Sequence, residues 1–202
     1  MGRDMTANHF KDLVRQTLFQ PGDAARQLIE FSLPRQWLWM AIALVSVLGS
    51  ILFSASLQMS PPDAQSAALI PSALRSPILF AVLLFAGFVV FSATLFYVGR
   101  WMGGTAEAID DIFAPLVWFQ ILRLVVQAIV LMLSFVAPGL VSIIVVVVFV
   151  WETYILVCFV DAAHRFGSVL KAAGAVILST LLIGIALSVI FSFIALTMTE
   201  GA

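Results

Sequence analysis

The fold is decided by the stretch LVWFQILRLVVQAIVLMLSFV-APG-LVSIIVVVVFVWETYILVCFV, residues 116–160. It contains two apolar runs, 116–136 and 140–160, that are separated only by Ala137, Pro138 and Gly139. A helix needs roughly 20 mostly apolar residues to cross a bilayer, and each run has that length. Three connecting residues permit only a tight antiparallel return. We therefore predict a hairpin of two transmembrane helices.

This hairpin carries the charged residues of the apolar runs. Arg123 lies 15 residues before Pro138 and Glu152 lies 14 residues after it. An antiparallel pair of helices places both at nearly the same depth, so we interpret them as an intramembrane ion pair. Gln120, Arg123 and Gln127 share one helix face, and polar side chains in lipid turn toward protein. We expect this polar stripe to face the interior of the bundle.

The composition of the whole chain points to the same environment. Of its 202 residues, 62% are hydrophobic and 10% are charged. Soluble domains have about 45–50% apolar and about 25% charged residues. The sequence thus predicts an all-α, polytopic membrane protein. A net charge of -1 argues against a nucleic-acid partner, which requires a clustered basic surface.

Five hydrophobic runs predict five spans in a single bundle, residues 37–202. Their expected bounds are 37–57, 78–98, 116–136, 140–160 and 174–196. Residues 1–36 form a separate amphipathic segment, in which apolar residues recur with a helical period opposite charged ones. Such a segment lies in the headgroup plane or packs under the bundle.

The distribution of Lys and Arg predicts the orientation. With the N-terminus inside, eight of the ten basic residues are cytoplasmic, Arg75 is outside and Arg123 is in the membrane. The positive-inside rule then gives a cytoplasmic N-terminus and an external C-terminus. We expect the protein in a bacterial inner membrane.

The loop after the second predicted span has its own turn signals. Gly103 and Gly104 permit a sharp turn with positive φ. Thr105 can cap a short helix, and Pro115 can open the third span. We predict a structured cytoplasmic turn at Gly103, Gly104 and Pro115.

Candidate chemical sites are weak. Asp110 and Asp111 are adjacent, so on a helix their side chains diverge by about 100° and do not converge on one metal. Asp161 and His164 have i, i+3 spacing, but a catalytic metal normally needs about three protein ligands. We therefore predict no catalytic residue, cofactor or metal, and no enzyme. A lipid-modifying enzyme that uses this pair at headgroup level is the less favoured reading.

Three blocks of the sequence resemble the Yip family of five-span membrane proteins, in its prokaryotic form. They are Phe19-Gln20-Pro21-Gly22-Asp23 through Trp37-Leu38-Trp39, Gly99-Arg100-Trp101-Met102-Gly103-Gly104, and Trp151 with the turn Asp161–Lys171. The resemblance implies a cytoplasmic N-terminus and a five-helix bundle. For eukaryotic relatives it also implies Rab-type GTPase binding and work in vesicle traffic. Their Asp-Leu-Tyr-Gly-Pro motif before the first span is absent here, which counts against GTPase binding.

Two functions remain in competition at this point. The first is a non-enzymatic scaffold that binds protein partners through residues 1–36 and the cytoplasmic loops, or that organises the bilayer, as a monomer or an oligomer. The second is a small transporter or channel subunit that uses Arg123, Glu152, Gln120 and Gln127. A single ion pair without a chain of protonatable groups makes a poor relay, so the scaffold is favoured.

Overall fold

The structure is a computed structural model that describes residues 7–59, 61, 65 and 71–200. Every regular element in these residues is helical. In chain order the helices are α1 (Ala7–Phe19), α2 (Pro21–Glu30), α3 (Arg35–Met59), α5 (Ser72–Arg75), α6 (Pro77–Trp101), α7 (Asp110–Val136), α8 (Pro138–His164) and α9 (Val169–Glu200). The all-α prediction is confirmed.

Five of these helices, α3, α6, α7, α8 and α9, are long and apolar enough to cross a membrane. Each contains one predicted span and extends beyond it. For example, α7 begins six residues before the predicted start at 116, and α9 begins five residues before 174. The hydrophobic run marks only the lipid-crossing part, whereas the helix continues into the polar boundary as long as its backbone hydrogen bonds can form.

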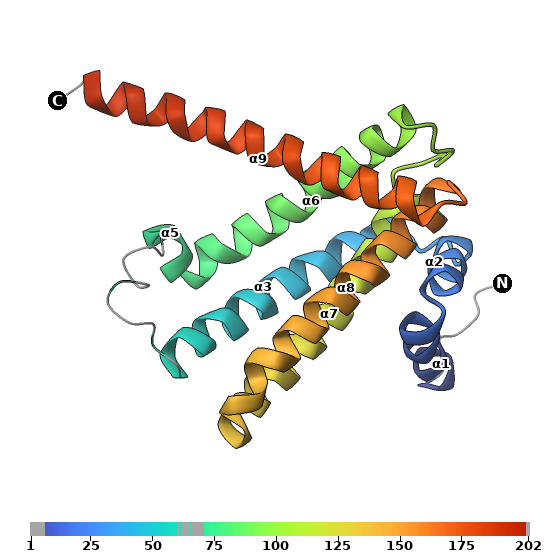
Figure 1. The fold of residues 1–202 in the computed structure, drawn as a ribbon, viewed down its shortest axis with the longest axis horizontal. Coiled ribbons are helices and arrows are strands. Elements are labelled where there is room, and N and C mark those ends of the chain that lie inside the picture. The colour runs from blue at the N-terminus through green and yellow to red at the C-terminus, as the bar shows by residue number, and fades with distance from the viewer. Residues whose placement is uncertain (1–6, 60, 62–64, 66–70, 201–202) are drawn as a thin grey trace.

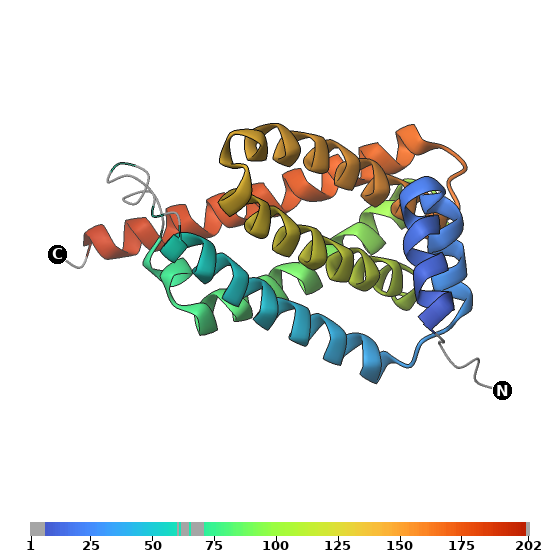
Figure 2. The same ribbon diagram turned by 90° about the horizontal axis from the view of Figure 1, so that it is seen from below.

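The long helices form a fan rather than a closed cylinder. They converge at one end and spread toward the other, where α9 points away from the α7–α8 pair (Figure 1). The helices α1 and α2, which we call the foot, lie across the converging end at a steep angle to the long helices (Figure 2). The C-terminus lies at the spread end, opposite the foot.

The core lies at the converging end. Leu95, Ile112 and Val160 come from three different helices and are almost fully buried there. Ala172 and Ala175 of α9 join the same core with no exposed surface. In lipid the hydrophobic effect does not drive helices together. Small side chains let the helix backbones approach closely, so that van der Waals contacts stabilise their association.

The hairpin that the sequence predicts is present, with a shorter connection than expected. α7 ends at Val136 and α8 begins at Pro138, so only Ala137 lies between them. Proline favours the first position of a helix because its fixed φ suits the helix and its missing N–H has no partner there anyway. The expected three-residue connection is thus wrong by two residues.

Two expectations about the loop before α7 are also wrong. Pro115 does not open the third span; it lies inside α7, which begins at Asp110. The short helix expected after Thr105 is absent, because the Asp111 carboxylate instead accepts hydrogen bonds from the backbone N–H groups of Glu107 (3.0 Å) and Ala108 (3.2 Å). These bonds fold the segment before α7 back onto its first turn, and α7 itself begins at Asp110 without a side-chain cap.

Candidate functional site

The foot is fastened to the bundle through an apolar cluster and one buried hydrogen bond. The indole Nε1 of Trp118 on α7 donates to Thr17 Oγ1 on α1 (3.0 Å), and the Thr17 hydroxyl donates to the Leu13 carbonyl (2.8 Å). The cluster around this bond contains Leu13, Ala24, Ala25, Leu28, Trp118, Ile155, Phe159 and Ala162. The amphipathic segment therefore packs its apolar side under the bundle, against α7 and α8.

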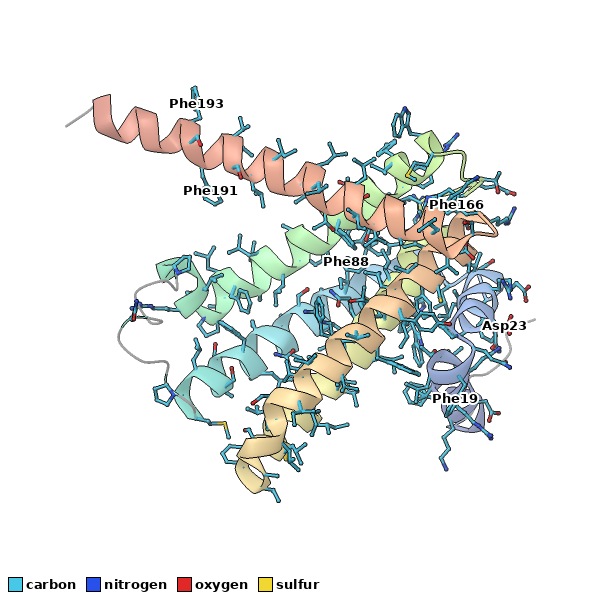
Figure 3. The ribbon with its side chains drawn as sticks, viewed as in Figure 1. Phe19, Asp23, Phe88, Phe166, Phe191 and Phe193 are labelled. Atoms are coloured by element: carbon cyan, nitrogen blue, oxygen red, sulfur yellow. The ribbon has the colours of Figure 1, made fainter. Side chains whose placement is uncertain are left out.

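The opposite side of the foot stays exposed and mixes apolar with charged groups. Phe19, at the end of α1, is 74% exposed, and Leu18 beside it is also exposed. The Arg26 guanidinium pairs with the Asp23 carboxylate one turn away on α2. Figure 3 shows Phe19 and Asp23 on the foot, away from the interior where Phe88 lies. Within the described part of the chain, this face of the foot therefore remains exposed.

The loop between α6 and α7 is built around the imidazole of His164, the last residue of α8. A Cβ added to Gly104 would lie 2.6 Å from His164 Cδ2, and one added to Gly99 would overlap the ring itself. Gly103 has a φ of 91°, in the region that favours glycine. The two glycines at 99 and 104 therefore form a cradle into which His164 inserts.

His164 connects three segments at the foot end. Its side chain has no exposed surface, and Nδ1 lies 3.2 Å from the Val160 carbonyl oxygen. The backbone N–H of Thr105 donates to the His164 carbonyl (2.8 Å). The ring of Phe166 stacks on the imidazole with centroids 5.0 Å apart. Within the described residues, Nε2 has no hydrogen-bond partner.

The acidic residues that the sequence singled out have separate structural contacts. Asp161 Oδ1 accepts a hydrogen bond from the backbone N–H of Ser168 (2.9 Å), so it holds the turn before α9. Asp110 accepts from Arg35 Nε through both oxygens (2.9 and 2.7 Å), which ties the start of α7 to the start of α3. Among the described residues, no group of three or more His, Cys, Asp or Glu side chains could hold a metal ion.

The structure brings Arg123 and Glu152 together at mid-depth of the hairpin. Arg123 is the central residue of α7, and its Nε lies 3.7 Å from Glu152 Oε2 on α8. The Glu152 side chain is 22% exposed, whereas that of Arg123 is 59% exposed. The guanidinium thus lies on the surface of the hairpin, and not in the bundle interior where we expected the whole stripe to face.

The remaining polar side chains of α7 line a cavity beside this pair. The cavity measures about 210 Å³ and lies between α3, α6 and α7. Gln120, Arg123 and Gln127 form its polar wall, and Ser46 of α3 adds a hydroxyl. The other lining residues are Ile42, Val45, Gly49, Phe53, Phe80, Leu84 and Leu124. The polar stripe of α7 therefore faces this cavity.

Comparison of the sequence with known protein families gives a match. The family model of the Yip1 domain matches residues 15–191, which is most of the 202-residue chain. The chain belongs to the Yip1 domain family. No curated protein and no solved structure shows a significant match to it. The match covers the foot from Arg15 onward, four of the five long helices in full and α9 as far as Phe191.

Two features of this Yip1-domain protein were missed by the sequence reasoning. The hydrogen bond between Thr17 and Trp118 joins residues 101 positions apart, and no local pattern connects them. The cradle of His164 had a partial signal, since Gly99 and Gly104 are both glycines near a helix end. Their partner could not be inferred, because it comes from the end of α8.

Proposed function

We propose that this Yip1-domain protein is a non-enzymatic membrane scaffold that presents its foot, on the cytoplasmic side, to protein partners or to the bilayer surface. The observation that supports this is the two-sided foot. One side is fixed by the Thr17–Trp118 hydrogen bond and its apolar cluster, while Phe19 remains exposed on the other. A rigidly held surface binds with less loss of conformational entropy than a free segment does.

The proposal is tested by photo-crosslinking in cells. A photoreactive phenylalanine analogue replaces Phe19, and the same analogue at Phe193 of α9 is the matched control, because that side chain is 68% exposed on a lipid-facing helix. We expect position 19 to give adducts with one protein of defined mass or with lipid headgroups. Position 193 should give acyl-chain adducts only.

A negative result is equally informative. Repeated purification without a stoichiometric partner, combined with unchanged bilayer properties in vesicles that contain the protein, contradicts the scaffold.

The second candidate function is a small transporter or channel subunit, favoured by the cavity beside Arg123. Ionisable residues inside a membrane are functional candidates by default. Here the charged residue also lines a cavity with two amides, which a purely structural pair does not require. Flux in proteoliposomes that disappears in Glu152→Gln while the protein remains folded supports transport. Absence of flux for a broad set of ions and small solutes argues against it.

A further inference from the structure

The Arg123 guanidinium has unused hydrogen-bonding capacity at a depth where water is scarce. Arg123 is seven residues from the start of the lipid-crossing run at 116, about 10 Å along the helix axis. At this depth its guanidinium lies beside Glu152. Its contact with Glu152, at 3.7 Å, is an ion pair longer than a hydrogen bond. Within the described residues, no hydrogen bond satisfies its N–H groups, and donors in lipid require partners.

The cavity next to this guanidinium has a polar wall and an apolar remainder. Gln120 and Gln127 flank Arg123 one helical turn away on each side, so three donor side chains converge on the same space. Across from them, Phe53 and Phe80 pack with ring centroids 4.6 Å apart and line one part of the cavity. An occupant must therefore combine a hydrogen-bond acceptor with an apolar body.

Charge further narrows the class of occupant. Arg123 lines the cavity and Glu152 does not, so the cationic member of the ion pair faces the cavity. A guanidinium carries five N–H donors, and the contact with Glu152 at 3.7 Å leaves donors for the oxygens of an occupant. A cavity of about 210 Å³ is smaller than the roughly 300–1,000 Å³ of sites for drug-sized ligands. It can take a carboxyl group and the first part of a chain, with the remainder in lipid.

We propose that this cavity is an intramembrane binding site for a monocarboxylic acid. The ligand enters from the lipid as the neutral acid and stays protonated. Its carboxyl oxygens accept hydrogen bonds from Arg123, Gln120 and Gln127, while Glu152 remains the counterion of Arg123. No proton is transferred, so no charge is added to the bilayer core. The inference deepens the transport alternative and is independent of the scaffold proposal.

The test is photolabelling of the purified protein in phosphatidylcholine nanodiscs. The probe is a decanoic acid that carries a diazirine near its methyl end, and labelled peptides are located by mass spectrometry. We expect saturable labelling of α3, α6 and α7 peptides that unlabelled decanoic acid suppresses and decanol does not. A second competition experiment uses acetate. If acetate competes with the probe, the site accepts short, water-soluble carboxylic acids. If acetate does not compete, the site requires an acid with an apolar chain.

Two variants test whether the probe binds in the cavity. Arg123→Gln/Glu152→Gln removes both charges and leaves two amides of similar size, and labelling should fall at least tenfold. Gly49→Leu keeps the ion pair and fills the cavity that Gly49 lines, and labelling should fall similarly. Gly87→Leu is the matched control, because a Cβ there meets no atom within 4 Å. It should label like the wild type.

Three results overturn the proposal. The first is equal competition by decanol, which means a crevice for any apolar chain. The second is undiminished labelling in Gly49→Leu, which remains informative if the charge-neutral double variant does not fold. The third is cross-linking of α7 to α7 between two copies in place of probe adducts, which means that a second copy covers the stripe. Because the readout is binding, its failure is distinguishable from a lack of transport.

Discussion

At the scale of single residues, the contact between His164 and Gly99 leaves the least room for change. The imidazole occupies the space where a Cβ at position 99 would lie, and both residues are buried. A larger residue forces the ring or the backbone to move, and overpacking of this kind costs typically 1–3 kcal/mol. We expect Gly99→Ala to lower the free energy of unfolding by about 2 kcal/mol, measured by thermal unfolding in detergent.

The same helix supplies the control for this prediction. Gly87→Ala places a Cβ in open space on α6 and should be neutral or slightly stabilising, since alanine is a better helix former than glycine. Gly99→Ala combined with His164→Ala should recover part of the loss, because the ring is removed. If Gly99→Ala and Gly87→Ala unfold at the same temperature, the cradle does not exist as described.

The ion pair of Arg123 and Glu152 is the second residue-scale prediction. Arg123→Glu or Glu152→Arg places two like charges at mid-depth, where one uncompensated charge costs roughly 3 kcal/mol. The double exchange restores an opposite pair. We expect each single variant to lose yield and thermal stability in detergent and the double exchange to recover most of both. No recovery, with Glu152→Gln folding normally, means that the two charges act separately and favours the transport function.

Between elements, the attachment of the foot can be tested through its buried hydrogen bond. Thr17→Val removes the acceptor for Trp118 Nε1 and leaves a buried N–H without a partner, which costs about 1–3 kcal/mol. We expect the foot to loosen before the bundle does. Faster trypsin cleavage at Lys11 and Arg15 would report this, with little change in the unfolding temperature of the spans.

A second threonine provides the comparison. Thr94→Val makes the same chemical change on α6, where the hydroxyl donates to the Val90 carbonyl of its own helix (2.8 Å). Cleavage of the foot should be unaffected there. Equal cleavage rates in both variants would show that the apolar cluster alone holds the foot in place.

The elements themselves were more predictable than their ends. The runs 116–136 and 140–160 predicted the hairpin, since length and apolarity suffice to identify a span. Helix starts were less predictable. Pro115 suggested that the helix of the third span starts there. In the structure α7 already begins at Asp110 and continues through the proline, and the Asp111 carboxylate binds the backbone N–H of Glu107 before the helix. Competing local signals of similar strength are settled by tertiary packing, which a single sequence does not show.

The candidate site shows the same limit in another form. Spacing around Pro138 placed Arg123 and Glu152 at one depth, and the structure has them 3.7 Å apart. Spacing does not state which way a helix is rotated, and the exposed guanidinium differs from the interior position we expected. Rotation is set by the packing of α7 against several helices at once. The polar stripe was therefore visible in the sequence, whereas the cavity that it lines between α3, α6 and α7 was not.

For the whole molecule, the spread end raises the question of what surrounds α9. Phe191 and Phe193 project from opposite sides of this helix, and both are exposed (Figure 3). Gly184, Ser188 and Ser192 of the same helix are exposed as well. In water such a helix would be unstable, but in lipid apolar side chains need no protein neighbour because the acyl chains are as apolar as they are. The fan shape is thus compatible with a bilayer.

The orientation of the molecule in that bilayer is the last prediction. Basic residues concentrate at the foot end, where Arg15, Arg26, Arg35, Arg165 and Lys171 lie on the foot or at helix ends beside it. The positive-inside rule therefore places the foot in the cytoplasm and the C-terminus outside. We expect alkaline phosphatase fused after Ala202 to be active and green fluorescent protein at the same position to be dark. The two reporters fused after Arg100, at the foot end of α6, should show the reverse, and fluorescence at both positions would contradict the five-span topology.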